Sequence, residues 1–113
     1  MPNPIVFFQI ATSDVPAARA FYGALFDWTI SDAGRIDPGG PADFDTTGEF
    51  RGLPEGQTPF VTPWFRVEDL QKTFARAQEL GAEVIIPIRQ GPGGQHLCLL
   101  RAPDGQTLGI VQA

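Results

Sequence analysis

Apolar and polar residues follow the same order twice along this chain. Ile5 to Ala11 alternates as a half-buried strand does, and an amphipathic helix capped by Ser13 or Asp14 follows it. Phe60 to Val67 and the helix after Asp69 repeat that order, and the offset from Asp14 to Asp69 is 55 residues. The repeat predicts one structural module that is used twice.

Turn residues divide the rest of each copy into short strands. Gly, Pro and Asp are frequent between Asp32 and Pro59, and Gly91 to Gly94 and Ala102 to Gly105 predict turns in the second copy. The strands expected between these breaks are Trp28 to Ile30, near Ala42 to Thr46 and near Glu49 to Leu53 in the first copy, and Val84 to Ile88, His96 to Arg101 and Thr107 to Val111 in the second.

Each copy is therefore expected to contain a strand, a helix and three further strands. One helix covers only one face of its sheet, so the other faces of two such sheets can curl together around a cleft. We predict the α+β class, with tandem βαβββ modules forming a curled sheet around a cleft. The whole chain, residues 1–113, is expected to form a single domain, with module one at about 4–57 and module two at about 58–113.

Charge and cysteine content narrow the class of protein. The formal net charge is −5, and no cluster of Lys or Arg is present, so neither nucleic acid nor an anionic membrane surface is expected as a partner. The chain has one cysteine, Cys98, which fits a reducing compartment. The first residues lack a basic and apolar leader pattern, and no apolar run is long enough to span a membrane. We therefore expect a cytoplasmic protein.

Three segments resemble the vicinal oxygen chelate superfamily, which includes glyoxalase I, bleomycin-resistance proteins and extradiol dioxygenases. They are ATSDVPAARAFYGALFDW, FRVEDLQKTFARAQELGAEVI and RAPDGQTLGIVQ, in that order, and the resemblance extends from about Val6 to Gln112. It implies the fold predicted above, a cleft that binds a small-molecule ligand, and a homodimer.

The resemblance also implies where a divalent metal would bind, because enzymes of this family use His or Gln on the first strand and Glu on the last strand of each module. Counting from the motifs places the first-strand positions at Phe7 and Thr62 and one last-strand position at Gly109, with its counterpart near Leu53 to Glu55. Phe and Gly have no side-chain donor, and a lone Thr hydroxyl is a poor ligand. We therefore predict no metal and no cofactor.

Six residues are predicted to line the ligand cleft. Gln9 is a lone amide in an apolar strand, and it could equally satisfy a neighbouring strand or loop. Trp64 and Arg66 share a strand face, and an aromatic plane beside a guanidinium commonly holds flat or anionic ligands. Packing of Trp64 and a surface ion pair of Arg66 would explain the same two residues. The predicted ligand-binding residues are Phe7, Gln9, Thr62, Trp64, Arg66 and His96.

His96 is the only histidine in the chain, and it could act as a general base with Cys98, which alternates onto the same strand face. A partly exposed strand histidine and a small buried cysteine are the alternative interpretation.

Three functions are compatible with these residues. The first is a glyoxalase/bleomycin-resistance-like protein that binds a small apolar or aromatic molecule in its cleft without metal. The second is a lyase or dioxygenase of the glyoxalase I type (lactoylglutathione lyase-like), which would use a divalent metal or a metal-free acid or base such as His96 or Glu55. The third is an interaction domain whose cleft is closed by phenylalanine packing. The sequence identifies no catalytic residue that decides among them.

Overall fold

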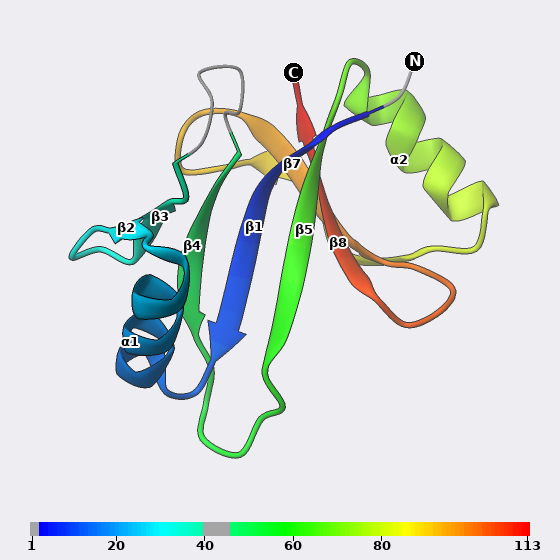
Figure 1. Cartoon of the computed structure of the whole chain (residues 1–113). Helices are drawn as coiled ribbons and strands as arrows, with labels where there is room; N and C mark the ends of the chain where they lie inside the picture. Colours follow the sequence, from blue (N-terminus) through cyan, green and yellow to red (C-terminus); the bar gives the residue numbers. More distant parts are fainter. Residues whose placement is uncertain (1–2, 40–45) are drawn as a thin grey trace. The chain divides into compact units, whose positions relative to one another are not determined.

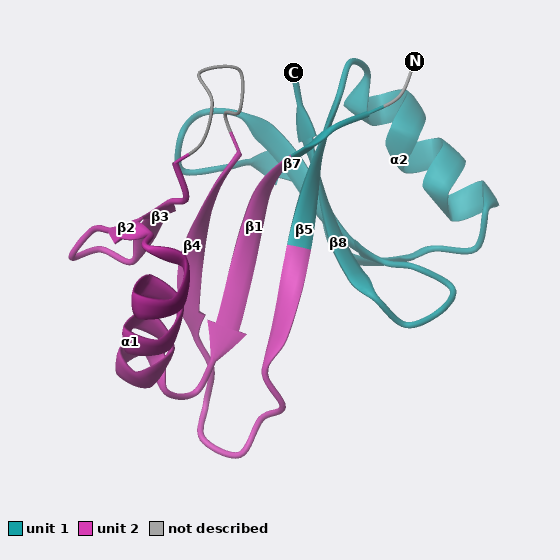
Figure 2. Ribbon diagram, in the orientation of Figure 1, with its two compact units in different colours: residues 1–5, 63–113 teal, residues 6–62 magenta. Residues whose placement is uncertain are grey.

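The computed structural model describes residues 3–39 and 46–113, and these residues divide into two units (Figures 1 and 2). Unit 2 comprises residues 6–62, and unit 1 comprises residues 63–113 together with the N-terminal residues up to Ile5. The boundary between the units falls inside strand β5. None of the described helices is both long enough and apolar enough to cross a membrane.

The described residues of unit 2 form one helix, four strands in the sheet order β2-β3-β4-β1 and the start of β5. β1 runs parallel to β4, whereas the β2–β3 and β3–β4 pairs are antiparallel. The helix begins where the Asp14 carboxylate accepts a hydrogen bond from the Ala17 amide at 3.1 Å, and it ends at Asp27, whose φ is 57°. The elements are β1 (Ile5–Thr12), α1 (Val15–Phe26), β2 (Thr29–Ile30), β3 (Arg35–Asp37) and β4 (Thr47–Gly52).

Unit 1 repeats this arrangement with the sheet order β5-β8-β7-β6. β5 is parallel to β8, as β1 is to β4, and the other pairs are antiparallel. Asp69 caps the helix by accepting from the Lys72 amide at 3.1 Å, and Gly81 follows the helix with a φ of 98°. The elements are β5 (Phe60–Val67), α2 (Leu70–Glu79), β6 (Glu83–Gln90), β7 (His96–Arg101) and β8 (Thr107–Gln112).

The α+β class and the repeated strand–helix–three-strand order are therefore confirmed. Each unit has a core cluster of apolar side chains between its own helix and one face of its own sheet. The buried core cluster of unit 2 consists of Ile10, Ile36 and Phe50, with Phe8, Val15, Ala18, Tyr22, Trp28 and Ile30 packed around them. The buried core cluster of unit 1 consists of Val67, Leu70, Cys98, Leu100 and Ile110, with Phe74, Ala77, Ile88 and Leu108 packed around them.

The segment before β4 departs from prediction. The strand expected near Glu49 to Leu53 begins two residues earlier, because Thr47 and Gly48 also belong to β4. Gly48 suits this strand because the ring of Phe8 covers it, and a Cβ there would lie 2.5 Å from that ring. β3 occurs where only irregular structure was expected. Thr46 lies outside any strand, and the rest of the strand predicted near 42–46 falls outside the described residues.

Candidate functional site

The helix-free face of unit 2 carries a paired amide and carboxylate. Phe8 and Ile10 pack with α1, so alternation along β1 places Phe7 and Gln9 on the opposite face. Gln9 is paired in register with Glu49 on β4, and its Nε2 donates a hydrogen bond to Glu49 Oε1 at 2.6 Å. Both residues are half-buried. A hydrogen bond to an ionised carboxylate in partial burial is stronger than a neutral one, so it holds both side chains in place.

The strand registers identify Glu49 as the counterpart of Gly109. Gln9 lies opposite Glu49 in the parallel pair β1–β4, and Trp64 lies opposite Gly109 in the parallel pair β5–β8. Gln9 and Trp64 are 55 residues apart, whereas Glu49 and Gly109 are 60 apart, because the second module has five more residues before its last strand. The placement of this position near Leu53 to Glu55 was therefore wrong, since it assumed a constant offset.

The residues at the four expected ligand positions do not fit a divalent metal. Phe7 has no donor, Thr62 offers a neutral hydroxyl that is only 2% exposed, and Gly109 is covered by the indole of Trp64. Only Glu49 is a carboxylate, and it already accepts from Gln9. Across residues 3–39 and 46–113, no group of three or more His, Cys, Asp or Glu side chains could hold a metal ion.

In unit 1, two of the predicted site residues share a face. Cys98, Leu100 and Ile110 pack with α2, so alternation places Trp64, Arg66 and Gly109 on the helix-free face. Trp64 lies across Gly109, and a Cβ on Gly109 would overlap the indole ring. Arg66 is exposed, and its backbone N–H donates to the Pro4 carbonyl at 3.0 Å. The structure therefore brings an aromatic plane and a guanidinium onto one strand face.

His96 does not share that face. His96 lies on the same side of β7 as Cys98 and Leu100, which pack with α2. Its side chain is exposed because it stands at the start of the strand. The prediction that His96 and Cys98 lie on the same side of the strand is confirmed, but Cys98 is fully buried whereas His96 is exposed. The remaining predicted residues, Phe7, Gln9 and Thr62, belong to unit 2. That all six line one ligand site stays a prediction.

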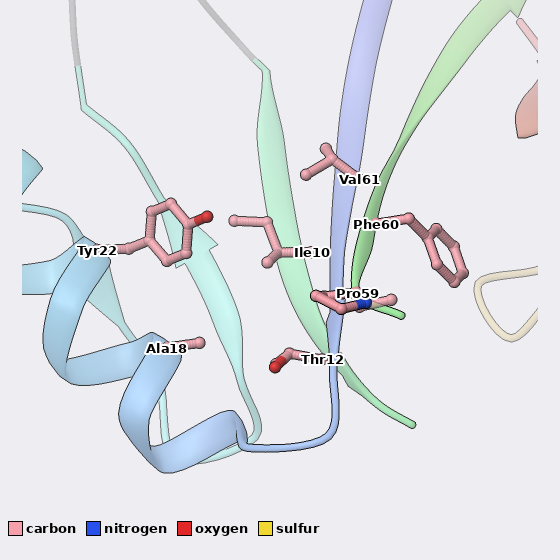
Figure 3. Close-up of a pocket in the computed structure, with 8 residues that line it drawn as sticks. Ile10, Thr12, Ala18, Tyr22, Pro59, Phe60 and Val61 are labelled. Atoms are coloured by element: carbon pink, nitrogen blue, oxygen red, sulfur yellow. The ribbon is translucent and has the colours of Figure 1, made fainter. Parts of the chain in front are cut away.

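Unit 2 also contains a cavity of about 360 Å³ that the sequence did not indicate (Figure 3). Side chains of α1 face those of β1 and the start of β5 across it, while the Phe60 ring turns away from them. The only pattern that could have indicated it is the helical spacing of Ala18 and Tyr22. The facing residues are Ile10, Thr12, Ala18, Tyr22, Pro59 and Val61. A second hollow of about 320 Å³ lies where β2, β3 and β4 meet and includes Arg35 and Asp37.

Burial of Cys98 is expected to make the free energy of unfolding fall as pH rises in the alkaline range. Burial raises the pKa of the Cys98 thiol from 9.0 to about 11. Above pH 9 the unfolded chain loses this proton before the folded chain does, so the free energy of unfolding falls as pH rises through that range. The contribution lost is at most roughly 2–3 kcal/mol. We expect the stability difference between the wild type and Cys98→Ala, measured by urea unfolding, to narrow between about pH 8 and about pH 10.5. Parallel pH profiles would contradict this assignment.

Comparison with known proteins identifies the family. Residues 4–110 match the model of the Glyoxalase/Bleomycin resistance protein/Dioxygenase superfamily. The chain is 26% identical over 114 residues to CFP32 of Mycobacterium tuberculosis (strain CDC 1551 / Oshkosh), named as a candidate glyoxylase, in an alignment that covers 93% of this chain and 44% of CFP32. It is 29% identical over 124 residues to the anthracycline biosynthesis protein DauV of Streptomyces sp. (strain C5), in an alignment that covers 99% of this chain and 42% of DauV.

The chain spans less than half the length of these two curated relatives. The crystal structure of the hypothetical protein BH1468 from Bacillus halodurans C-125 superimposes with a TM-score of 0.71 at 13% identity, and the match covers 100% of this chain and 96% of that chain. This likeness shows a shared fold. The family model spans nearly the whole chain, and the resemblance noted in the sequence is thereby confirmed: the protein belongs to the Glyoxalase/Bleomycin resistance protein/Dioxygenase superfamily.

Proposed function

We propose that this protein binds a small aromatic or apolar molecule that carries a hydrogen-bond donor or a cationic group, and that it does so without a metal. The observation that carries the proposal is the Gln9–Glu49 pair, which supplies a fixed carboxylate on a strand face that also presents Phe7. Ligand sites commonly combine apolar lining with a few oriented polar groups. A half-buried carboxylate beside an aromatic ring suits the amine of a flat organic ligand.

The types of residue at the expected ligand positions support a metal-independent site. Glu49 is the only strong metal-ligating side chain among the four positions, since the others are Phe7, Thr62 and Gly109. A single carboxylate is a weak ligand set for a divalent ion. The name of DauV links that relative to anthracyclines, which are aromatic molecules, and this is consistent with the proposed ligand class. A cytoplasmic location and a homodimer remain proposals that rest on the sequence.

Calorimetric titration with doxorubicin, an aromatic anthracycline that carries an amine, tests this proposal. Glu49→Gln keeps the size of the side chain but removes its charge, and we expect it to weaken binding about tenfold, the effect of losing one charge-assisted hydrogen bond. Glu83→Gln is the matched control, because Glu83 is a strand carboxylate whose side chain is 74% exposed and forms an ion pair with Arg101 at 3.5 Å.

Binding that survives chelator treatment, falls in Glu49→Gln and is unchanged in Glu83→Gln would support the proposal. Equal affinities in the wild type and both variants would contradict the role of Glu49. Affinity that disappears with chelator and returns with added metal would contradict the metal-free site.

A glyoxalase-type lyase is the second candidate function. The observation that favours it is the carboxylate of Glu49 at the place where the family pattern expects one, together with the glyoxylase name of CFP32. A positioned carboxylate can abstract a proton next to a carbonyl. Turnover of the adduct of methylglyoxal and glutathione, abolished in Glu49→Gln and retained in Glu83→Gln, would favour the enzyme over the binding protein.

A further inference from the structure

The second hollow of unit 2 is polar, and the Gln9–Glu49 pair does not line it. Its volume of about 320 Å³ is near the lower end of the range for ligand pockets, roughly 300–1,000 Å³. It lies where β2 and β3, at the edge of the sheet, meet β4. Three hydroxyls, one guanidinium and one carboxylate line it, from Thr29, Ser31, Thr47, Arg35 and Asp37. The hollow therefore presents both donors and acceptors of hydrogen bonds.

Strand alternation and register place this hollow beside the Glu49 carboxylate. Ile36 is buried in the core cluster that packs with α1, so Arg35 and Asp37 lie on the helix-free face of β3. Arg35 is opposite Glu49 in the antiparallel β3–β4 pair, and Gln9 is opposite Glu49 in the β1–β4 pair. Directly opposed residues of an antiparallel pair have Cβ atoms about 4.5–5.5 Å apart. One ligand can therefore contact both Glu49 and Arg35.

The second module shows that the fold does not require this polar row. The corresponding row across β5, β8 and β7 consists of Trp64, Gly109 and Leu99. The position that Arg35 occupies in unit 2 is thus a leucine that is only 8% exposed in unit 1. The same sheet position accepts an apolar residue, so the charge of Arg35 is not a requirement of the fold.

Backbone contacts hold parts of the lining in place without using all of its hydrogen-bonding capacity. Asp37 Oδ1 accepts from the Gly39 amide at 3.0 Å, and Ser31 Oγ accepts from the Arg35 amide at 3.0 Å. A carboxylate can accept several hydrogen bonds, and a hydroxyl that accepts one still has a proton to donate. Within the described residues, the Arg35 guanidinium forms no ion pair or hydrogen bond. Its donors are therefore available to a ligand.

We infer that the ligand of the proposed function carries a sugar ring, and that this ring binds in the hollow. The inference rests on that function and narrows its ligand class to aromatic glycosides. One positive and one negative side chain balance each other in the lining, so it favours neither an anion nor a cation. A sugar hydroxyl is neutral and both donates and accepts, so it can donate to Asp37 and accept from Arg35. The hydroxyls of Thr29 and Thr47 suit the same type of group.

The spacing of the strands suits a ligand with two parts. Phe7 is opposite Thr47 in the β1–β4 pair, and β3 is the next strand beyond β4. Two strand spacings separate Phe7 from the β3 side of the hollow, about 10 Å. An aromatic ring system over Phe7 and a sugar joined to it span this distance, with Glu49 between them on β4.

Calorimetric titration with N-acetyldoxorubicin and with its aglycone tests the inference. Both are uncharged aromatic molecules, and only the first carries a sugar. We expect the glycoside to bind about tenfold more tightly than the aglycone. Asp37→Asn and Arg35→Gln should each weaken binding of the glycoside about fivefold and leave binding of the aglycone unchanged.

Two matched controls come from unit 1. Asp104 Oδ1 accepts from the amide two residues further along at 3.1 Å, as Asp37 does at 3.0 Å, so Asp104→Asn makes the same change in a similar turn. Arg89 is an exposed strand arginine, as Arg35 is, so Arg89→Gln is the second control. Both controls should bind the glycoside as the wild type does, and circular dichroism should show that all four variants are folded.

The outcomes separate the sugar site from the proposed function. Equal affinities for the glycoside and the aglycone, or wild-type affinity for the glycoside in both Asp37→Asn and Arg35→Gln, would overturn the sugar site and leave an aromatic site intact. Tighter binding of the glycoside in Asp37→Asn would assign the hollow to an anionic group, and tighter binding in Arg35→Gln would assign it to a cationic group. A wild type that binds neither doxorubicin nor either of these two compounds would overturn the inference together with the proposed function.

Discussion

Gly109→Ala is expected to lower the free energy of unfolding by about 2–3 kcal/mol, although one methyl group is all that it adds. The indole of Trp64 lies directly over Gly109, and a Cβ there would overlap the fused part of the ring system. That part of the side chain cannot rotate away without moving the whole indole. Gly109 has no positive φ, so alanine would otherwise be tolerated in the strand and would even reduce the entropy of the unfolded chain. Urea unfolding measures the change.

A double-mutant cycle separates steric overlap from other causes. In a Trp64→Leu background the smaller side chain no longer covers Gly109, so Gly109→Ala should cost less than about 0.5 kcal/mol there. Gly52→Ala is a second comparison, because no atom lies within 4 Å of a Cβ built at this exposed glycine. Equal costs of Gly109→Ala in both backgrounds would contradict the packing that the structure shows.

The same overlap leaves no room for a carboxylate side chain at position 109 while Trp64 keeps its place. A glutamate there would first have to displace Trp64, which pairs with Gly109 across β5 and β8. In unit 2 the equivalent pair is Gln9 and Glu49, whose side chains contact each other through a hydrogen bond of 2.6 Å. The two modules therefore present different chemistry at one structural position: a packed indole in unit 1 and an oriented carboxylate in unit 2. Ligand chemistry is accordingly proposed for unit 2.

The sequence predicted the main elements well where local signals are strong. Asp14 and Asp69 cap the two helices as expected, because a carboxylate before an apolar repeat satisfies free helical N–H groups. The spans Phe60–Val67 and His96–Arg101 were predicted with their observed bounds, since alternation and turn residues delimit them. The short strand β3 and the start of β4 were missed, because their Gly-rich surroundings favour turns when tertiary contacts are unknown.

The candidate site depends on information that no local pattern contains. Glu49 was placed in an expected strand but not in the ligand site, because its partner Gln9 is 40 residues away and the register of a parallel pair is set by the whole sheet. A fixed repeat offset then placed the last-strand carboxylate of the first module near Leu53 to Glu55 instead of at Glu49. The exposure of Phe21 and Leu25 was also missed, since both residues fit the spacing of an amphipathic helix whether or not the protein core covers them.

Leu100→Ala is expected to destabilise the protein by about 3–4 kcal/mol, the largest effect of any single truncation proposed here. Leu100 is fully buried in the core of unit 1, where it packs with Val67, Leu70 and Ile110 under α2. Removing its side chain leaves a cavity that β7, which is hydrogen-bonded to strands on both sides, cannot close by moving. The midpoint of urea unfolding should fall, with little change in its slope.

Leu80→Ala makes the same chemical change at a site that is 61% exposed, so it should alter the free energy of unfolding by less than about 0.5 kcal/mol. The difference between the two leucines therefore measures burial in unit 1 rather than the identity of the residue. A small loss in Leu100→Ala, similar to that in Leu80→Ala, would mean that the core between α2 and the sheet is loosely packed. In that case the packing of Trp64 on Gly109 could not be treated as rigid, and the predicted cost of Gly109→Ala would fall with it.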